Sequence, residues 1–343
     1  MSPSNSNARG RSAGRVTLAD VAREAGVSPI TASRALRGER HVAPELAARV
    51  AEAVAKTGYV PDSAARALAS QRGTQVPVLI PMLSNTLFVD VIEAVHRVLF
   101  AAGYQPMIGI THYDPHEEEQ LLRSYLAHRP AGLLVTGFDR TESSRQLIAG
   151  SGLPCVHLME IANAPGVHCV GFSQTDAGAE VTRHLLARGR RRIACIAAQL
   201  DPRTIQRAEG YRNVLRSAGC YDPRLELMSR QSSSIGLGAE LLADLMKIRP
   251  DVDGIFFCND DLAQGGILAA QRMGISVPGQ IAIAGFNDLP GSDQLSPSLT
   301  SVRTPRSEVG TQGAKMLLEL MRGNTPAERS ISLKYELVVR ESS

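Results

Sequence analysis

The 343-residue sequence predicts an all-α N-terminal domain followed by an α/β domain of two lobes, each built on a doubly wound parallel sheet. Two patterns predict this division. Apolar residues recur with the spacing of amphipathic helices near the N-terminus, whereas from Val76 onward short apolar runs alternate with amphipathic segments. The length also exceeds that of one ordinary domain, so several folded units are expected.

Two short helices about a tight turn are predicted at the start. The first covers Leu18–Ala25, with Thr17 as its N-cap and Gly26 as a left-handed stop. Ser28 then caps a second helix whose first position is Pro29, where the missing N–H costs nothing. Such a pair is a helix-turn-helix, which places its second helix in the major groove of DNA.

The charge distribution supports a DNA-binding head. Residues 1–72 hold 11 Lys and Arg against 6 Asp and Glu, whereas the remainder holds 26 against 28. Basic charge is therefore concentrated in the region of the predicted helix pair, where it would favour binding of a polyanion such as DNA. A third helix from Pro44 to the stop at Gly58 completes a helix-turn-helix domain over residues 15–61. Residues 1–14 are predicted to be a disordered tail, whose arginines either lie along phosphates or are simply solvated.

A linker is predicted over residues 62–73. Tyr59-Val60-Pro61 breaks the chain, and Asp62 can cap a short Ala-rich helix over Ser63–Ser70. This helix is shorter than the roughly 12–15 residues that are marginally stable alone in water. It is therefore expected to fold only when something packs on it, as a hinge would on binding DNA.

Residues 74–343 are predicted to form the two-lobed α/β domain. The predicted buried strands are Val76–Pro81, Gln105–Ile110, Gly132–Thr136, Cys155–Leu158, Ile193–Ala197, Gly254–Cys258 and Ile281–Phe286. Between them fall helical patterns such as Val89–Ala102, Asp176–Arg188, Arg207–Ala218, Leu237–Lys247 and Leu262–Met273.

Composition argues against several other classes of protein. The five cysteines are widely spaced with no Cys-x-x-Cys pair, which favours reduced thiols in a cytoplasmic protein. No signal peptide and no apolar run long enough to span a membrane is found. Nucleotide-binding and zinc-protease motifs are also absent, so an enzyme, a cofactor and a metal site are not expected. A transport-type sugar-binding protein would carry a signal peptide and no DNA-reading head.

The sequence resembles the LacI family of bacterial transcription repressors over nearly its whole length. The stretches that carry the resemblance are Val16-Thr-Leu-Ala-Asp-Val-Ala-Arg-Glu-Ala-Gly-Val-Ser, Gly58-Tyr-Val-Pro-Asp, Ala65-Arg-Ala-Leu-Ala, Asn259-Asp-Asp-Leu-Ala, Val277-Pro and Ala284-Gly-Phe-Asn-Asp. Within the family the sequence looks most like the gluconate-utilisation repressors. Here the segments are Leu79-Ile-Pro-Met-Leu-Ser-Asn, Leu158-Met-Glu, Leu200-Asp-Pro-Arg-Thr-Ile, Gln231-Ser-Ser-Ser and Val302-Arg-Thr-Pro. The resemblance implies that residues 74–343 are an effector-binding and dimerisation domain whose two lobes have a periplasmic-binding-protein-like architecture. It places lobe one at about 74–172 and 303–331, and lobe two at about 173–302 and 332–343.

Ten residues are expected to contact DNA. Arg34 can pair with guanine, whereas Pro29 and Ile30 would read thymine methyl groups or shape; core packing of Ile30 is the alternative. The resemblance assigns phosphate contacts to Thr17, Ser28, Thr31, Ser33 and His41, although each hydroxyl can instead act as a helix cap. In the linker it implies that Leu68 wedges into the minor groove with Arg66 nearby; alternatively Leu68 packs on its own protein.

Effector-binding residues are expected where strands end, because ligands of open parallel sheets bind at the carboxyl edge. The candidates are Ser84, Asn85, Phe88, His157, Glu160, Arg203, Thr204, Arg207, Asn259, Asp261 and Asn287. Arg207 matches the family's effector-gripping arginine, and Arg203 would add a second cationic contact. Asp260 is expected only to cap a helix. Two arginines among amide and hydroxyl groups suit a carboxylate-bearing polyol. Glu160 and Asn287 depart from the residues common in the family, which leaves a neutral sugar or a nucleobase as alternatives.

Together these features predict a homodimeric repressor that binds a pseudo-palindromic operator. A sugar acid such as gluconate, or a keto or phospho derivative, is expected to close the lobes and release DNA. Alternatively, the ligand acts as a corepressor and strengthens DNA binding.

Overall fold

The computed structural model describes residues 16–36, 38, 41–60, 73–83 and 86–343, which fall into two compact units. The predicted linker lies outside these residues, apart from Gly73. The smaller unit is all-α and holds helices α1 (Leu18–Ala25), α2 (Pro29–Leu36) and α3 (Pro44–Thr57). Their apolar faces meet in one small core.

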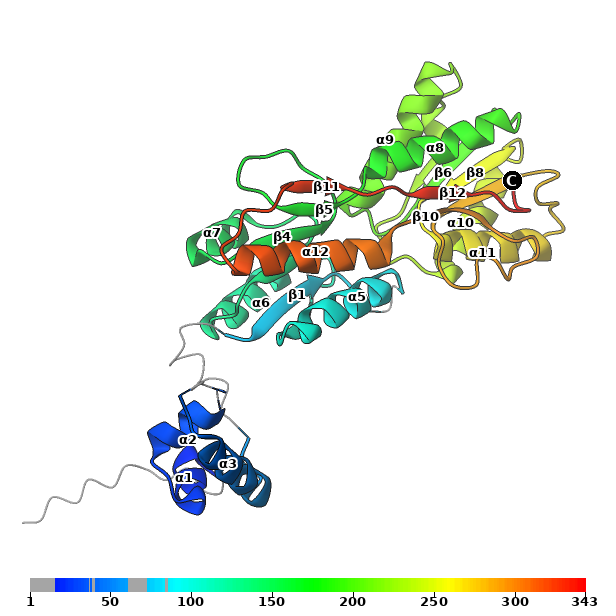
Figure 1. Ribbon diagram of the computed structural model, residues 1–343. Coiled ribbons are helices and arrows are strands. Elements are labelled where there is room, and N and C mark those ends of the chain that lie inside the picture. The colour runs from blue at the N-terminus through cyan, green and yellow to red at the C-terminus, as the bar shows by residue number, and fades with distance from the viewer. Residues whose placement is uncertain (1–15, 37, 39–40, 61–72, 84–85) are drawn as a thin grey trace, which may run out of the picture. The chain divides into compact units, whose positions relative to one another are not determined.

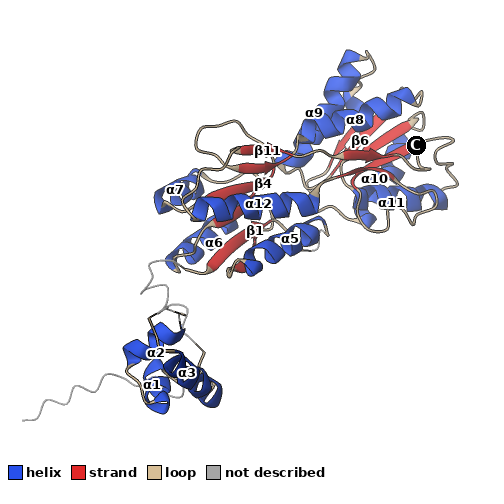
Figure 2. Cartoon of the chain, in the orientation of Figure 1, coloured by secondary structure: helices blue, strands red, loops and turns tan. Residues whose placement is uncertain are grey.

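The larger unit has two lobes, each with a six-stranded sheet and helices on both faces (Figure 2). The strands of lobe one, in their order across the sheet, are β11 (Ser330–Ser332), β5 (Cys169–Gly171), β4 (Cys155–Met159), β3 (Leu133–Thr136), β1 (Gln75–Ile80) and β2 (Gln105–Ile110). All of their pairings are parallel. Its helices are α5 (Leu87–Ala101), α6 (Pro115–Ala127), α7 (Glu142–Ser151) and α12 (Arg306–Met321).

Lobe two repeats this design. Its strands, in sheet order, are β12 (Glu336–Val338), β10 (Thr300–Arg303), β9 (Ala282–Asn287), β8 (Gly254–Phe257), β6 (Ile193–Ala197) and β7 (Glu226–Met228). Only the edge strand β12 runs antiparallel to its neighbour. Its α-helices are α8 (Gln174–Ala187), α9 (Pro202–Ser217), α10 (Ile235–Ile248) and α11 (Asp260–Arg272).

Within residues 86–343 the chain passes between the lobes three times: after β5, between β10 and α12, and between β11 and β12. Figure 1 shows the consequence for lobe one, where α12 lies alongside α5 although their sequences are far apart. Leu317 of α12 and Val91 of α5 are both buried in the core beneath this sheet. Neither lobe is therefore a continuous stretch of sequence.

The strands predicted from apolar runs all exist, whereas the predicted helices α5, α8, α10 and α11 each begin two residues earlier than expected and α9 begins five residues earlier. The pattern placed its first residue at Arg207, whereas α9 begins at Pro202. Asp201 accepts a hydrogen bond from the backbone N–H of Arg203 and so caps the helix ahead of a proline at its first position. The correction brings Arg203, Thr204 and Arg207 together into the first two turns of one helix.

Candidate DNA-reading helix and effector site

Helix α1 is capped at both ends. The Thr17 hydroxyl accepts from the Asp20 N–H and donates to the Asp20 carboxylate, which in turn accepts from the Thr17 N–H. Gly26 adopts the left-handed conformation that ends α1. From α3, Arg49 Nη2 donates to the Ala25 carbonyl at 2.6 Å, so the third helix fixes the turn.

Helix α2 buries Ala32 and exposes the residues expected to read bases. Pro29 and Arg34 are exposed, and Ile30 is 66% exposed. The alternative of Ile30 as a core residue of this unit is therefore wrong. Ser28 Oγ accepts from the Thr31 N–H at 3.1 Å, so this hydroxyl does act as a cap, as Thr17 does in α1.

The remaining DNA candidates divide in two. His41 is exposed and Ser33 is half-buried on α2. Arg66 and Leu68 lie outside the described residues, as do the effector candidates Ser84 and Asn85.

The effector region begins with two helices packed backbone to backbone. A Cβ on Gly210 of α9 would lie 2.0 Å from the Thr175 carbonyl oxygen, and one on Gly178 of α8 would lie 2.3 Å from that of Arg207. This approach brings the start of α8 against α9, where Gln174 Oε1 accepts from Arg207 Nε at 2.8 Å. The two glycines thus position the arginine.

Arg207 is a buried cation held by neutral groups. Its Nη1 donates to the Cys258 carbonyl at 2.7 Å and to Asn259 Oδ1 at 2.8 Å, and its guanidinium lies 4.0 Å from the centroid of the Phe286 ring. Among the described residues, no carboxylate pairs with it and its Nη2 has no partner. Burial lowers the pKa of Arg207. Asp201 acts on this guanidinium electrostatically from a greater distance, but among the described residues no carboxylate is in direct contact with it.

Amide groups surround this cation. Asn287, 1% exposed, donates its Nδ2 towards Asn259 Oδ1 at 3.5 Å, while its own Oδ1 is buried with no partner among the described residues. Ser233 links the next pair, because it donates to Asp261 Oδ1 at 2.7 Å and lies 3.3 Å from Asn259 Nδ2. A buried oxygen without a donor is costly, so the region suits a ligand that supplies one.

Arg203 does not make the open cationic contact that was expected. It lies within 3.1 Å of three carboxylates, those of Asp139, Glu160 and Asp201. Burial opposes the charged form, but these carboxylates raise its pKa above the ordinary value. Asp139 and Glu160 belong to lobe one, whereas Arg203 belongs to lobe two. Arg203 is thus a bridge between lobes, and Glu160 is engaged in that bridge and with Gln206 Nε2 at 2.8 Å.

The other candidates lie apart from Arg207 or serve its helix. Phe88 is buried in the apolar core, and Thr204 donates its hydroxyl to Asp201 at 2.8 Å. His157 alternates with the core residues Val156 and Leu158 along β4, so its side chain is on the opposite face of the sheet, beside Arg140. The structure does not bring His157 to the cluster around Arg207.

Sequence reasoning missed Gln174, Asp139 and Asp201. The Asp201-Pro202 pair was a usable signal, because an N-cap followed by proline marks a helix start. Asp260 was expected only to cap a helix. It is instead fully buried and accepts hydrogen bonds from Leu289 N–H, Ser292 Oγ and Ser301 Oγ, which ties β10 and the segment after β9 to α11.

Comparison with known proteins now completes the assignment. The family described as bacterial regulatory proteins, lacI family, matches residues 17–62, and the periplasmic binding protein-like domain matches residues 182–343. The HTH-type transcriptional regulator GntR of Pseudomonas aeruginosa is 53% identical over 343 residues, which is 100% of both chains. The chain belongs to the LacI family. GntR of Escherichia coli K12 is 36% identical over 323 residues, covering 94% of this chain and 97% of its own.

Solved structures agree with this LacI-family assignment. The transcription regulator GntR from Chromobacterium violaceum superposes with a TM-score of 0.77 at 48% identity, covering 78% of this chain and 99% of its own. The LacI-family chain is a DNA-binding transcriptional regulator and not an enzyme. None of its described helices has the length and apolar character needed to cross a membrane.

Proposed function

We propose that this regulator is a homodimeric repressor that a sugar acid, such as gluconate or a keto or phospho derivative, releases from its operator. The observation that carries the proposal is Arg207, a buried guanidinium with no carboxylate partner among the described residues. A buried charge without a counter-ion is unfavourable, so an anionic ligand would be strongly favoured there.

The neighbouring groups favour hydroxyls on the same ligand. The orphaned Oδ1 of Asn287 requires a donor, and a hydroxyl supplies one. Asn259 and Ser233 add amide and hydroxyl groups close to Arg207. Because Arg203 is engaged by three carboxylates, Arg207 is the one arginine of the two that can make a direct contact with a ligand carboxylate. This arrangement favours a monocarboxylate polyol over its phosphorylated derivative.

At the DNA end, each head is proposed to read one half-site of a pseudo-palindromic operator. The exposed face of α2 would present Arg34 and Ile30 to the major groove, with Leu68 of the linker at the operator centre. A dimer is supported by apolar side chains exposed along one edge of lobe one: Val89 and Phe100 on α5 and Ile108 on β2.

Ligand binding is proposed to favour a closed arrangement of the lobes, which alters the linkers and releases DNA. The ligand can shift this equilibrium only by its difference in affinity between the two states. A neutral sugar as effector would leave Arg207 without a counter-ion, which is why the acid is preferred. The same site could instead bind a corepressor. The test below distinguishes a ligand that releases DNA from one that tightens DNA binding.

The test uses the full chain bound to a fluorescent operator selected by the protein from random DNA. Gluconate, a ketogluconate, 6-phosphogluconate and neutral glucose are titrated in, and release is followed by anisotropy. Gluconate is expected to release DNA where glucose does not. Equal release by glucose would overturn the carboxylate proposal, and tighter binding with gluconate would make it a corepressor.

Variants of one helix then locate the site. Arg207→Ala should abolish the response while operator affinity is retained. Arg216→Ala removes a half-exposed arginine of the same helix and should respond as the unmodified protein does. A retained response in Arg207→Ala would place the ligand elsewhere.

A further inference from the structure

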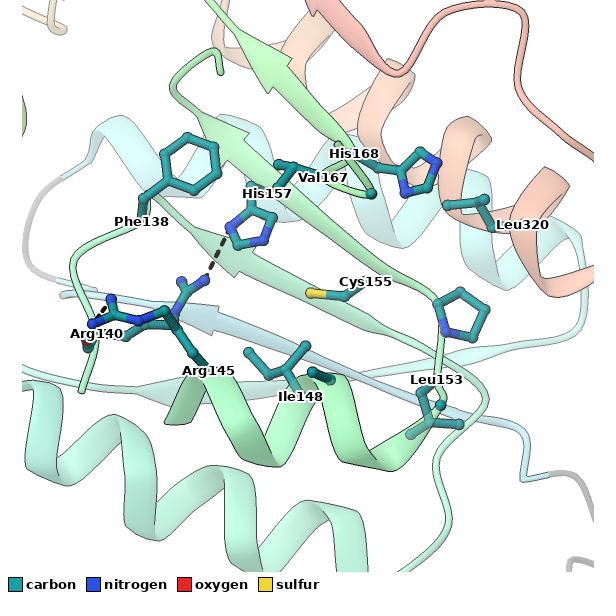
Figure 3. Close-up of a pocket in the computed structure, with 14 residues that line it drawn as sticks. Phe138, Arg140, Arg145, Ile148, Leu153, Cys155, His157, Val167, His168 and Leu320 are labelled. Atoms are coloured by element: carbon teal, nitrogen blue, oxygen red, sulfur yellow. Dashed lines mark hydrogen bonds between the residues drawn. The ribbon is translucent and has the colours of Figure 1, made fainter. Parts of the chain in front are cut away.

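A pocket of about 630 Å³ lies on the face of lobe one that carries α7. It is bounded by α7, by the start of β4, by residues 166–168 ahead of β5 and by the end of α12 (Figure 3). Most of its wall is apolar, from Phe138, Ile148, Leu153, Val167 and Leu320. Its volume is within the ~300–1,000 Å³ typical of small-molecule sites.

Polar groups gather at one side of this pocket. Arg140, whose side chain is 2% exposed, donates its Nη1 to His157 Nδ1 at 3.0 Å, as Figure 3 shows. His157 Nδ1 also lies 2.9 Å from the Gly137 carbonyl oxygen, and the Phe138 ring stacks on the imidazole with ring centroids 4.5 Å apart. Burial lowers the pKa of His157 to about 4, so the ring is neutral near pH 7.

Arg145 supplies the cation at the rim. Its Nε donates to Glu142 at 2.9 Å and its Nη1 to the Arg140 carbonyl at 2.9 Å. Its Nη2 has no partner among the described residues, and the side chain is about half exposed. An apolar chamber with one available guanidinium edge suits a molecule that has an apolar body and one carboxylate.

We propose that this pocket is a second small-molecule site, which takes an aromatic or aliphatic monocarboxylate and modulates the site between the lobes. The binding part of this proposal stands independently, whereas the modulation rests on the proposed function of the Arg207 site.

One turn connects the two sites. Residues 137–140 follow β3, and Phe138 and Arg140 of this turn line the pocket. The two alternate residues face the other way: Asp139 pairs with Arg203, and a Cβ on Gly137 would lie 2.2 Å from Arg203 Nη1. Arg140 Nη2 also donates to the Gly137 carbonyl at 3.0 Å. A ligand that shifts Phe138 or Arg140 would therefore move Asp139 and change the bridge at Arg203.

A buried ion pair runs beside this turn. Arg140 Nε donates to Glu118 at 2.8 Å, with side chains only 2% and 7% exposed. Breaking such a pair is unfavourable, so Arg140 is expected to move with its neighbours and not alone. This rigidity favours transmission from the pocket to Asp139.

Binding is tested by calorimetry on the full chain with benzoate, phenylacetate and octanoate, and with benzyl alcohol as the neutral control. At least one acid is expected to bind, and benzyl alcohol to bind more weakly. Arg145→Ala should weaken the acid about tenfold, and Ile148→Trp should fill the chamber and abolish binding. Arg97→Ala, which removes an exposed arginine of α5 outside the pocket, should change nothing. Failure of all three acids, or binding that both pocket variants leave intact, would overturn the site.

Modulation is tested by the affinity for gluconate with and without the bound acid. The acid should change gluconate affinity, and gluconate should change acid affinity by the same factor. Asp139→Asn should remove this coupling but leave acid binding intact. If the acid binds and gluconate affinity stays constant, the modulation is wrong and the site stands. If gluconate does not bind at all, the proposed function fails while acid binding still decides the pocket.

Discussion

Arg203 and Glu160 form an ion pair of 3.0 Å although they belong to different lobes. Both side chains are nearly inaccessible to solvent, at 5% and 7% exposure. Charge at the site is thereby divided between two arginines: Arg203 is neutralised by protein carboxylates, whereas Arg207 is available to a ligand. Side chains of the protein itself therefore join the two lobes through ion pairs.

Arg203→Ala is expected to destabilise the larger unit by about 3–5 kcal/mol, because it leaves buried carboxylates without their counter-ion. Differential scanning calorimetry of the full chain measures this loss. Arg322→Ala breaks the Arg322–Glu319 pair, which is largely exposed, and should change stability by less than about 1 kcal/mol. Equal effects of the two substitutions would contradict the role of Arg203 as a bridge.

Gly137→Ala is expected to disturb the same bridge sterically. The added Cβ would lie 2.2 Å from Arg203 Nη1 and 2.4 Å from Glu160 Oε2. Gly152→Ala is the matched control, since both glycines have positive φ, of 63° and 65°, but nothing lies within 4 Å of a Cβ at Gly152. The two variants share the backbone strain. A lower melting temperature for Gly137→Ala than for Gly152→Ala therefore reports the clash, and equal values would exclude it.

Arg34→Ala should weaken operator binding by about 1–3 kcal/mol, with the loss confined to operators that retain the base it reads. Anisotropy titrations over a set of single-base operator variants measure this. Arg23→Ala removes an exposed arginine from α1 and should show no base preference. A uniform loss for Arg34→Ala over all sequences would indicate a phosphate contact instead.

Stability should fall on acidification because of His157. Its pKa is lowered to about 4 in the folded protein by burial and by Arg140, whereas the ordinary value is 6.5. The unfolded chain therefore takes up a proton before the folded one, and the contribution of His157 is lost as pH falls from about 6.5 towards 4. His157→Asn keeps an acceptor for Arg140 but does not titrate. Its melting temperature should depend less on pH over this interval; identical slopes would count against the assignment.

Local chemistry made much of the fold predictable. The caps at Thr17, Gly26 and Ser28 and the apolar strands all correspond to structure. What escaped prediction depends on partners distant in sequence. Strand β11 has only three residues, two of them serine. It forms because the chain that follows α12 passes beside β5 and pairs with it.

The site divides in the same manner. Arg207, Asn259 and Asn287 could be anticipated because strands end or helices begin near them, and the structure does bring them together. The neutralisation of Arg203 could not, because Asp139 and Glu160 follow two different strands of the other lobe. His157 was misplaced because alternation along β4 determines which face a side chain occupies.

The three passages between lobes also bear on synthesis. Lobe one lacks α12 and β11 until residue 332 has been synthesised. The apolar surface on which Val309 and Leu317 of α12 later pack therefore stays uncovered while the segment from α8 to β10 is translated. At about 5–20 residues per second this interval lasts on the order of 10 s. The nascent chain therefore holds an unfinished sheet during a large part of its synthesis, when exposed apolar surface is prone to aggregation.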